Sequence, residues 1–167
     1  MFQWKIITLP TKEVPPVRLK INDNFAPLRA FFFEAPESAY PRIIEAACSG
    51  VGSGFNSAGV IFPDDLDEDD EPIAPNMVEV YDPIDSVEIP KTTFWLVLLD
   101  VAETTLRVRE QGAEVAYEWK EKMQEAITRL RTVLVDEMSL LASPAIAHSL
   151  LAEAEKTSIG QAVAVPI

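Results

Sequence analysis

The sequence has few of the residues on which most catalytic and metal sites depend. Its 167 residues include one cysteine, Cys48, and one histidine, His148. A single cysteine excludes an intramolecular disulfide and a metal site built on several thiolates. A Cys48–His148 pair for nucleophilic catalysis stays open, although roughly a hundred residues separate the two. We therefore expect no catalytic residue, no cofactor and no metal ion, and hence a protein that is not an enzyme.

Long apolar runs are also missing. The longest wholly apolar run is Phe94–Leu99, whereas a helix that spans a bilayer needs about 20 apolar residues. The first residues, Met1–Lys5, show no basic start followed by a long apolar stretch, so no signal peptide is evident. These two absences predict a soluble, cytoplasmic protein.

Positive charge is scarce, and negative charge is concentrated in one part of the chain. The sequence has 27 acids and 14 bases, a net charge of −13. Residues 61–100 hold twelve of the acids and one base, whereas residues 1–60 are nearly neutral, with six bases and five acids. Proteins that bind nucleic acids or anionic membranes gain affinity by neutralising phosphates, so both classes of partner are disfavoured.

The acidic excess centres on Asp64–Glu71, in which only Leu66 is uncharged. Such a run cannot pack in a core without pairing, so we expect a solvated loop. An EF-hand calcium loop starting at Asp65 fails, because Asp70 stands where glycine is required and Asn76 where glutamate is required. Two interpretations stay open: a loop that only aids solubility, or an electrostatic arm that docks a basic partner.

The glycine-rich stretch Gly50–Gly54 does not match a phosphate-binding motif. A Walker A loop needs Lys-Ser or Lys-Thr after its last glycine, and here Phe55-Asn56 follows. The dinucleotide fingerprint lies between a strand and a helix, and the flanking pattern here is the reverse. We interpret the stretch as a connector.

The first ninety residues read as short strands and turns. β-branched, aromatic or alternating segments bounded by proline and glycine are typical of strands. The exception is Tyr40–Cys48, where Pro41 and an apolar stripe predict a short helix. The predicted strands are Trp4–Leu9, Val17–Ile21, Arg29–Glu34, Ser57–Phe62, Met77–Tyr81 and Ser86–Ile89.

After Pro90 the apolar residues recur at helical spacing. One helix should run from Pro90 toward Gly112, and a second of about six turns should bury a stripe from Val115 to Leu134. Ser143-Pro144 predicts a third helix, and the last residues form a tail that returns as an edge strand or stays loose. The stripe residues of the second helix are Val115, Trp119, Met123, Ile127, Leu130 and Leu134.

This order predicts an α+β fold in which an N-terminal antiparallel sheet of short strands packs against C-terminal amphipathic helices. We expect one domain over residues 1–167, with a strand-rich part (1–90), a helical part (91–156) and a tail (157–167). A small sheet domain joined to a helical hairpin stays open.

One aromatic residue stands out as a possible contact point. Trp95 lies off the apolar line that Phe94 and Leu98 form along the predicted helix. Tryptophan is enriched among residues that anchor protein interfaces, so Trp95 is the aromatic residue that we expect at an interface.

The predicted elements from Val78 to Leu99 follow the order strand, turn, strand and then a helix that opens with Phe94-Trp95. This pattern resembles that of small immunity proteins of bacterial polymorphic-toxin and contact-dependent inhibition systems. The resemblance implies a cytoplasmic, non-catalytic protein that neutralises one cognate toxin by tight binding. Many such toxins are basic nucleases, to which an acidic loop is complementary.

We therefore predict an acidic binding protein whose partner is a protein, most concretely a basic toxin or effector domain. One alternative is a secretion or assembly chaperone that binds its client as a dimer, through an apolar face on the helix from Glu114 to Val135. A carboxylate or metal enzyme is the third possibility. The predicted partner-binding residues are Asp64, Asp65, Asp67, Glu68, Asp69, Asp70, Glu71, Asp82, Asp85 and Trp95.

Overall fold

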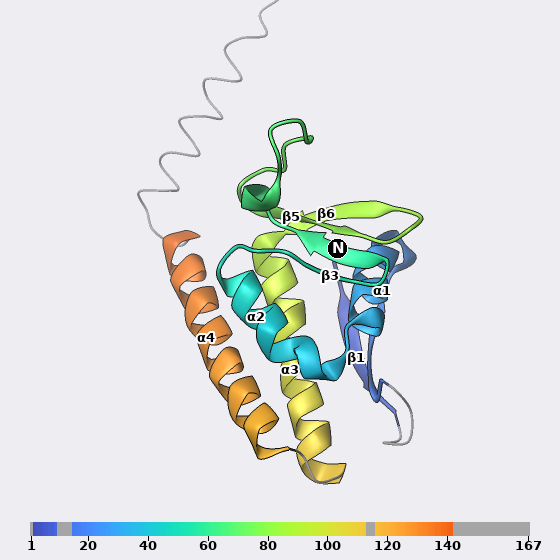
Figure 1. The fold of residues 1–167 in the computed structure, drawn as a ribbon, viewed down its shortest axis with the longest axis vertical. Helices are drawn as coiled ribbons and strands as arrows, with labels where there is room; N and C mark the ends of the chain where they lie inside the picture. The colour runs from blue at the N-terminus through green and yellow to red at the C-terminus, as the bar shows by residue number, and fades with distance from the viewer. Residues whose placement is uncertain (1, 10–14, 113–115, 142–167) are drawn as a thin grey trace, which may run out of the picture.

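The computed structural model describes residues 2–9, 15–112 and 116–141. Within these described residues, six strands and four α-helices follow one another in the order β1, β2, α1, α2, β3, β4, β5, β6, α3 and α4. This order confirms the α+β class predicted from the sequence, with the two long helices at the C-terminal end of the described chain (Figure 1). The predicted helix at Ser143-Pro144, the tail 157–167 and His148 lie outside the described residues.

The strands form two antiparallel sheets instead of the single sheet that we expected. In the first, β1 (Trp4–Thr8) pairs with β2 (Val17–Ile21). The second is a meander in which neighbours along the chain are neighbours in the sheet. Its strands are β3 (Ser53–Phe55), β4 (Ala58–Ile61), β5 (Met77–Tyr81) and β6 (Ser86–Pro90). Asn56, with a φ of 50°, turns the chain between β3 and β4.

The segment Arg29–Glu34 is helical, so its prediction as a strand was wrong. It belongs to α1 (Ala26–Glu34), which begins with Pro27 in the first turn. Leu28, Phe31 and Phe32 are buried, which is an i, i+3, i+4 pattern, while Phe33 is 57% exposed. The aromatic run is therefore divided between two sides of a helix, and its β propensity is overridden by packing.

The other helices begin close to the predicted residues. Helix α2 spans Tyr40–Cys48 as predicted, and α3 spans Lys91–Gly112. Helix α4 spans Tyr117–Leu141, which makes it about seven turns long instead of about six.

Helix α3 lies at the centre of the molecule. It contacts β1 and β2 on one side and α4 on another, and its first turns lie against β5 and β6 (Figure 1). Helix α4 packs on α2 and α3, so it forms a helical layer and does not cover a sheet as the sequence led us to expect. Of the predicted α4 stripe, Met123, Ile127, Leu130 and Leu134 are buried and Trp119 is half-buried, while Val115 lies outside the described residues.

Four phenylalanine rings connect the meander to α1 and α3 in one hydrophobic cluster. The ring of Phe94 at the start of α3 lies 6.0 Å from Phe31, 6.3 Å from Phe32 and 6.1 Å from Phe62, measured between centroids. Phe94 is fully buried. The cluster thus joins α1, the end of β4 and α3 and fixes the meander above the helices.

Glu37, in the short 3-10 helix before α2, ties three elements together. Its carboxylate accepts a hydrogen bond from Arg109 Nε of α3, and its backbone carbonyl accepts one from Trp119 Nε1 of α4 at 3.1 Å. Burial, together with the charge on Glu37, holds the pKa of Tyr40 well above its ordinary value of 10. These contacts hold α3 and the first turn of α4 against the 3-10 helix that precedes α2.

Candidate interaction surfaces

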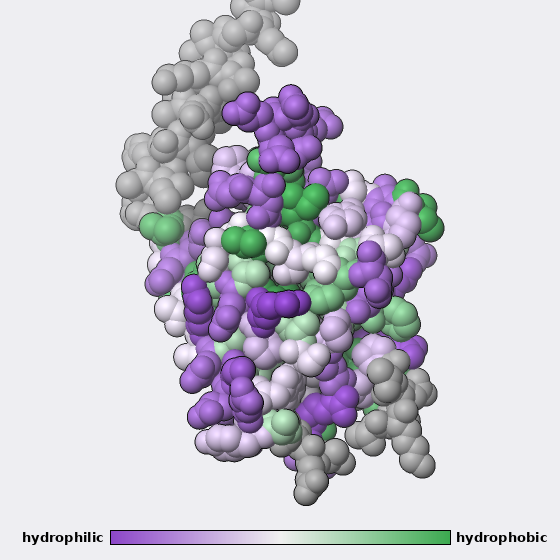
Figure 2. Space-filling view, in the orientation of Figure 1, coloured by the Kyte–Doolittle hydropathy of each residue, from purple (hydrophilic) through white to green (hydrophobic). Residues whose placement is uncertain are grey.

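The acidic segment Asp64–Glu71 lies in the connection between β4 and β5, which runs from residue 62 to residue 76. The connection begins with the short 3-10 helix Pro63–Asp65, and residues 66–76 form no helix or strand. Long connections without secondary structure are uncommon and are usually functional or linker segments. The side chains of Asp64–Glu71 are exposed, except for the half-buried Leu66. The segment projects from one end of the meander and forms a hydrophilic cap there (Figures 1 and 2).

The segment is fastened at both ends. The carboxylate of Asp65 accepts hydrogen bonds from the backbone N–H of Gly52 at 2.6 Å and of Phe62 at 2.9 Å. At the far end Ile73 is buried, and the N–H of Lys91 donates to the carbonyl of Asn76 at 2.8 Å. The residues between Asp65 and Ile73 are therefore held to the rest of the fold at both ends.

The carboxylates of the segment divide into two groups. Asp65 binds the backbone of the sheet, and Asp70 accepts a hydrogen bond from the N–H of Asp67 at 2.9 Å within a local turn. The others, Asp64, Asp67, Glu68, Asp69 and Glu71, accept no hydrogen bond through their side chains from any described residue. No ion pair within residues 2–9, 15–112 and 116–141 involves the segment either.

Asp82 and Asp85 do not join the acidic segment. They lie in the turn between β5 and β6, at the opposite end of β5, so the five residues of that strand, about 16 Å, separate the two groups. Asp82 Oδ1 accepts hydrogen bonds from the N–H of Ile84 at 2.8 Å and of Asp85 at 3.0 Å. Asp85 Oδ1 accepts one from the N–H of Ser86 at 2.9 Å. Both residues therefore shape the turn.

Trp95 lies in the core, and the expectation that it anchors a partner is corrected. Its side chain is 3% exposed, and its indole N–H donates to the carbonyl of Ala47 in α2 at 3.2 Å. The ammonium of Lys91 lies 5.2 Å from its ring centroid. The sequence showed that Trp95 lies on a different side of the helix from Phe94. Only the packing of α2 showed that this side of α3 is also buried.

Cys48, the single cysteine of the sequence, lies half-buried at the end of α2 and forms no disulfide. Burial raises the pKa of its thiol, the charge of Arg129 opposes this rise and the charge of Glu45 adds to it. A raised pKa reduces the thiolate that a nucleophile needs. The structure gives no geometry for a Cys48–His148 pair, because His148 lies outside the described residues.

No metal-binding cluster was found among the described residues: they contain no group of three or more histidine, cysteine, aspartate or glutamate side chains suited to hold an ion. The glycine-rich stretch instead makes close backbone contacts. A Cβ on Gly52 would lie 2.3 Å from the carbonyl oxygen of Val60 and 2.7 Å from Asp65 Oδ2. Gly52 is therefore needed for packing against β4 and the Asp65 anchor.

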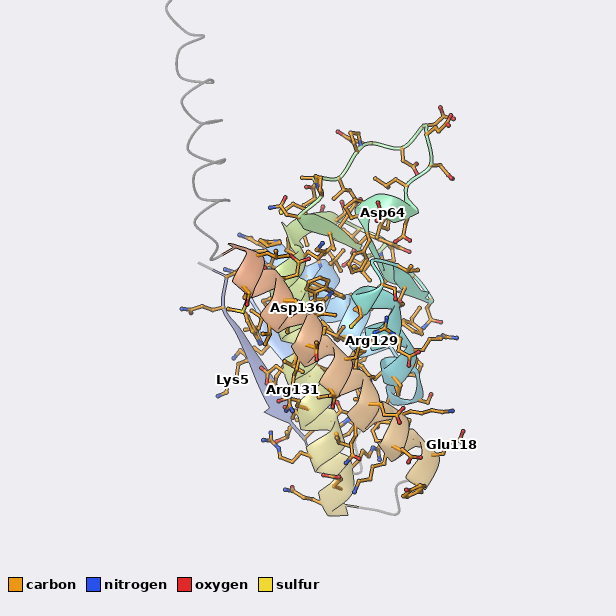
Figure 3. All side chains as sticks on the ribbon, turned by 90° about the vertical axis from the view of Figure 1, so that its left-hand side faces the viewer. Lys5, Asp64, Glu118, Arg129, Arg131 and Asp136 are labelled. Carbon is orange, nitrogen blue, oxygen red and sulfur yellow. The ribbon has the colours of Figure 1, made fainter. Side chains whose placement is uncertain are left out.

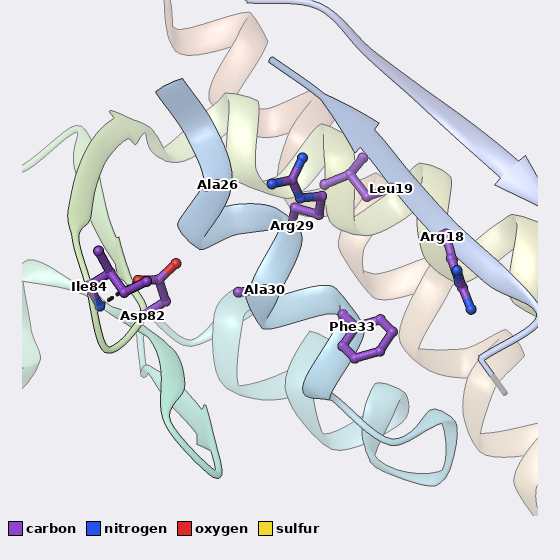
Figure 4. A pocket seen from close by; sticks show the side chains of 8 residues that line it. All are labelled: Arg18, Leu19, Ala26, Arg29, Ala30, Phe33, Asp82 and Ile84. Carbon is purple, nitrogen blue, oxygen red and sulfur yellow. Dashed lines mark hydrogen bonds between the residues drawn. The ribbon is translucent and has the colours of Figure 1, made fainter. Parts of the chain in front are cut away.

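A second surface, which the sequence pattern did not predict, is the α1 groove, a hollow of about 430 Å³ between α1, β2 and the β5–β6 turn (Figure 4). It combines exposed apolar side chains with two guanidinium groups. The misassigned strand at Arg29–Glu34 concealed it, because only a helix places Ala26, Ala30 and Phe33 on one face. The α1 groove is lined by Arg18, Leu19, Ala26, Arg29, Ala30, Phe33, Asp82 and Ile84.

The outward face of α4 is charged. Two hollows lie beside it, of about 590 and 340 Å³, and both are lined mostly by charged and polar side chains instead of the apolar face expected for a chaperone. The apolar stripe of α4 is buried against α2 and α3, and Figure 3 shows Glu118, Arg129, Arg131 and Asp136 along the helix. Among the described residues of α4, large apolar side chains are exposed at both ends: Tyr117 at the start is 76% exposed, and Val135, Met138 and Leu140 near the C-terminal end are 62%, 56% and 58% exposed.

Comparison with known proteins finds no matching family model, no matching curated protein and no matching solved structure. Within the described residues, no helix has both the length and the apolar character needed to cross a membrane.

Proposed function

We propose that this chain is a non-catalytic binding protein that docks a basic protein partner through the acidic segment Asp64–Glu71. One observation carries the proposal: seven acids in eight residues are held between two anchored points, and none of them forms an ion pair with a described residue. Neighbouring carboxylates closer than the Debye length, about 8 Å at physiological salt, repel one another. A cationic partner relieves this repulsion, so the free energy favours the complex.

The mechanism requires no chemistry from this chain. Complementary charge raises association rates by a factor of about 10 to 1,000, and the effect falls as salt is added. The carboxylates that accept no hydrogen bond from a described residue, such as Asp67, Glu68 and Asp69, remain available to lysine and arginine side chains of the partner. Asp65 has a different role, because it holds the segment in place.

The most concrete version is an immunity protein that neutralises a basic toxin by covering its active site. It is supported by the acidic segment and by the resemblance of the Val78–Leu99 sequence pattern to immunity proteins. Its direct test is co-expression with the product of the neighbouring open reading frame, with cell growth as the readout. Growth arrest by that product alone and rescue by this chain are expected; a harmless neighbour would contradict the toxin version.

The docking segment can be tested with a charge-matched pair of variants. Asp67→Asn/Glu68→Gln/Asp69→Asn removes three charges from the segment and leaves the hydrogen-bonding carboxylates of Asp65 and Asp70 intact. Glu121→Gln/Glu125→Gln/Asp136→Asn removes three charges from exposed positions on α4. The partner is first recovered from the source cell on the immobilised full chain, and its association rate is then measured by stopped flow at several salt concentrations.

We expect the segment variant to slow association about tenfold at low salt and to flatten the salt dependence, because steering depends on local charge. The α4 variant should change the rate much less. If the two variants behave alike, the segment acts only through net charge and the docking proposal fails.

The chaperone alternative has one feature in its favour, the exposed apolar residues Val135, Met138 and Leu140 near the end of α4. It differs from the main proposal in oligomeric state and client. An obligate dimer in sedimentation analysis that binds an unfolded client would favour the chaperone, whereas a monomer bound to a folded basic partner would favour the docking segment.

A further inference from the structure

The α1 groove exposes apolar side chains on both of its walls. Ile84, at the tip of the β5–β6 turn, is 94% exposed, and Phe33, at the end of α1, is 57% exposed. These residues are about fifty positions apart in the sequence, and folding brings both to one hollow (Figure 4). Exposed apolar patches rimmed by polar groups mark sites of interaction.

Between these walls, small side chains line the floor of the groove. Ala26 and Ala30 lie one turn apart on the outward side of α1, and Phe33 follows one turn later. Methyl side chains let another backbone approach closely, while the two larger residues give apolar contact at the rim. This shape suits an amphipathic helix that lays its apolar face into a groove.

The charge at the groove is opposite in sign to that of the chain as a whole. Arg18 and Arg29 line it, and the Arg18 guanidinium lies 5.8 Å from the centroid of the Phe33 ring. On the outer face of the first sheet Lys20 stands next to Arg18 in β2 and pairs across the strands with Lys5. The net charge of the chain is −13, so this is a local basic surface on an acidic protein.

Two nearby carboxylates, Asp82 and Asp23, lower the positive charge at the groove. Asp82 accepts hydrogen bonds from its own turn, and the ion pair of Arg29 with Asp23, at 3.3 Å, is exposed, with 93% of the Asp23 side chain in solvent. Exposed ion pairs contribute little and exchange readily. A guanidinium has five N–H donors, so Arg29 can bind a second carboxylate while it keeps Asp23.

We propose that the α1 groove binds an amphipathic helical segment of a partner protein. The apolar side of that helix lies over Ala26, Ala30 and Phe33 and against Ile84, and aspartate or glutamate side chains along its edge meet Arg18 and Arg29. The groove lies at the end of β5 opposite the acidic segment, so the two surfaces differ in place and in charge preference. This inference does not depend on the function proposed for the acidic segment.

The test uses a displayed library of random 16-residue peptides, panned on the full chain. Enriched peptides are synthesised, and their dissociation constants are measured by fluorescence anisotropy. Two variants remove groove features: Ile84→Asp places a charge on the apolar wall, and Arg29→Gln removes a guanidinium. Both positions are exposed, so the variants should fold, which circular dichroism and thermal unfolding verify.

Matched controls make the same changes elsewhere. Val135→Asp alters an exposed apolar residue on α4, and Arg42→Gln alters an exposed arginine on α2. We expect enriched peptides that carry apolar residues at helical spacing together with Asp or Glu. Each groove variant should weaken their binding about tenfold or more, as is typical of an interface anchor, while the controls bind like the native chain.

Three outcomes overturn the proposal: no peptide is enriched, the enriched peptides are basic, or their binding is unaffected by Ile84→Asp and Arg29→Gln. Basic peptides whose binding depends on Asp67–Asp69 would support the acidic segment and refute the groove, so the two proposals fail separately.

Discussion

Asp65 should stabilise the fold, in contrast to the other acids of its segment. Its carboxylate accepts hydrogen bonds from the N–H groups of Gly52 and Phe62, at 2.6 and 2.9 Å. Asp65→Ala removes the acceptor and leaves both N–H groups without it. Hydrogen bonds to charged groups contribute about 1.5–3 kcal/mol each, but this site is partly exposed, and water can replace part of the interaction. We expect a loss of about 2 kcal/mol in total.

A loss of about 2 kcal/mol corresponds to a fall in melting temperature of roughly 4–8 °C for a protein of this size. Chemical denaturation gives the free energy of unfolding, and hydrogen exchange locates the change, which should appear at the amides of Gly52 and Phe62. Asp65→Asn should lose less, because an amide oxygen still accepts hydrogen bonds.

The matched control is Asp69→Ala, four residues away in the same segment. Asp69 is exposed and its carboxylate accepts no hydrogen bond from any described residue, so its loss should change stability by less than about 0.5 kcal/mol. If Asp65→Ala and Asp69→Ala unfold at the same denaturant concentration, Asp65 does not anchor the segment, and the division of the acids into anchoring and available groups is wrong.

Two further predictions concern the core. Phe94→Ala should lower the free energy of unfolding by about 3–5 kcal/mol, because removal of a fully buried ring that contacts three other aromatic rings leaves a cavity. Phe33→Ala, at a position that is 57% exposed, should lower it far less. Equal losses in denaturant unfolding would show that the ring cluster does not hold the core together. Tyr40 has a raised pKa because it is buried near Glu37, so its contribution to stability should be intact below pH 10 and should be lost as the pH rises above the ordinary tyrosine pKa. Tyr40→Phe should flatten this alkaline loss in unfolding measured from pH 8 to pH 12, and an unchanged pH profile would contradict the assignment.

The sequence determined the elements whose signal is local. Alternating Val17–Ile21 forms a strand, Tyr40–Cys48 forms the predicted helix, and the stripe from Met123 to Leu134 faces the core, because period and side-chain polarity act within a few residues. The exposure of Asp64–Glu71 also followed from local chemistry, since unpaired carboxylates remain in water.

Only the tertiary structure decided the points that depend on distant residues. The aromatics of Arg29–Glu34 favour a strand locally, but Phe31 and Phe32 pack against Phe94 in α3, and a helix places them on one face. Trp95 is buried where α3 meets α2, about fifty residues earlier in the chain, and its indole N–H donates to the carbonyl of Ala47.

The arrangement of the candidate surfaces is decided in the same way. Antiparallel pairing sends Asp82 and Asp85 to the end of β5 away from the acidic segment, and the α1 groove exists only where β2, α1 and the β5–β6 turn meet. The periodicity of one segment does not predict which distant elements come into contact, because those contacts depend on the packing of the whole fold.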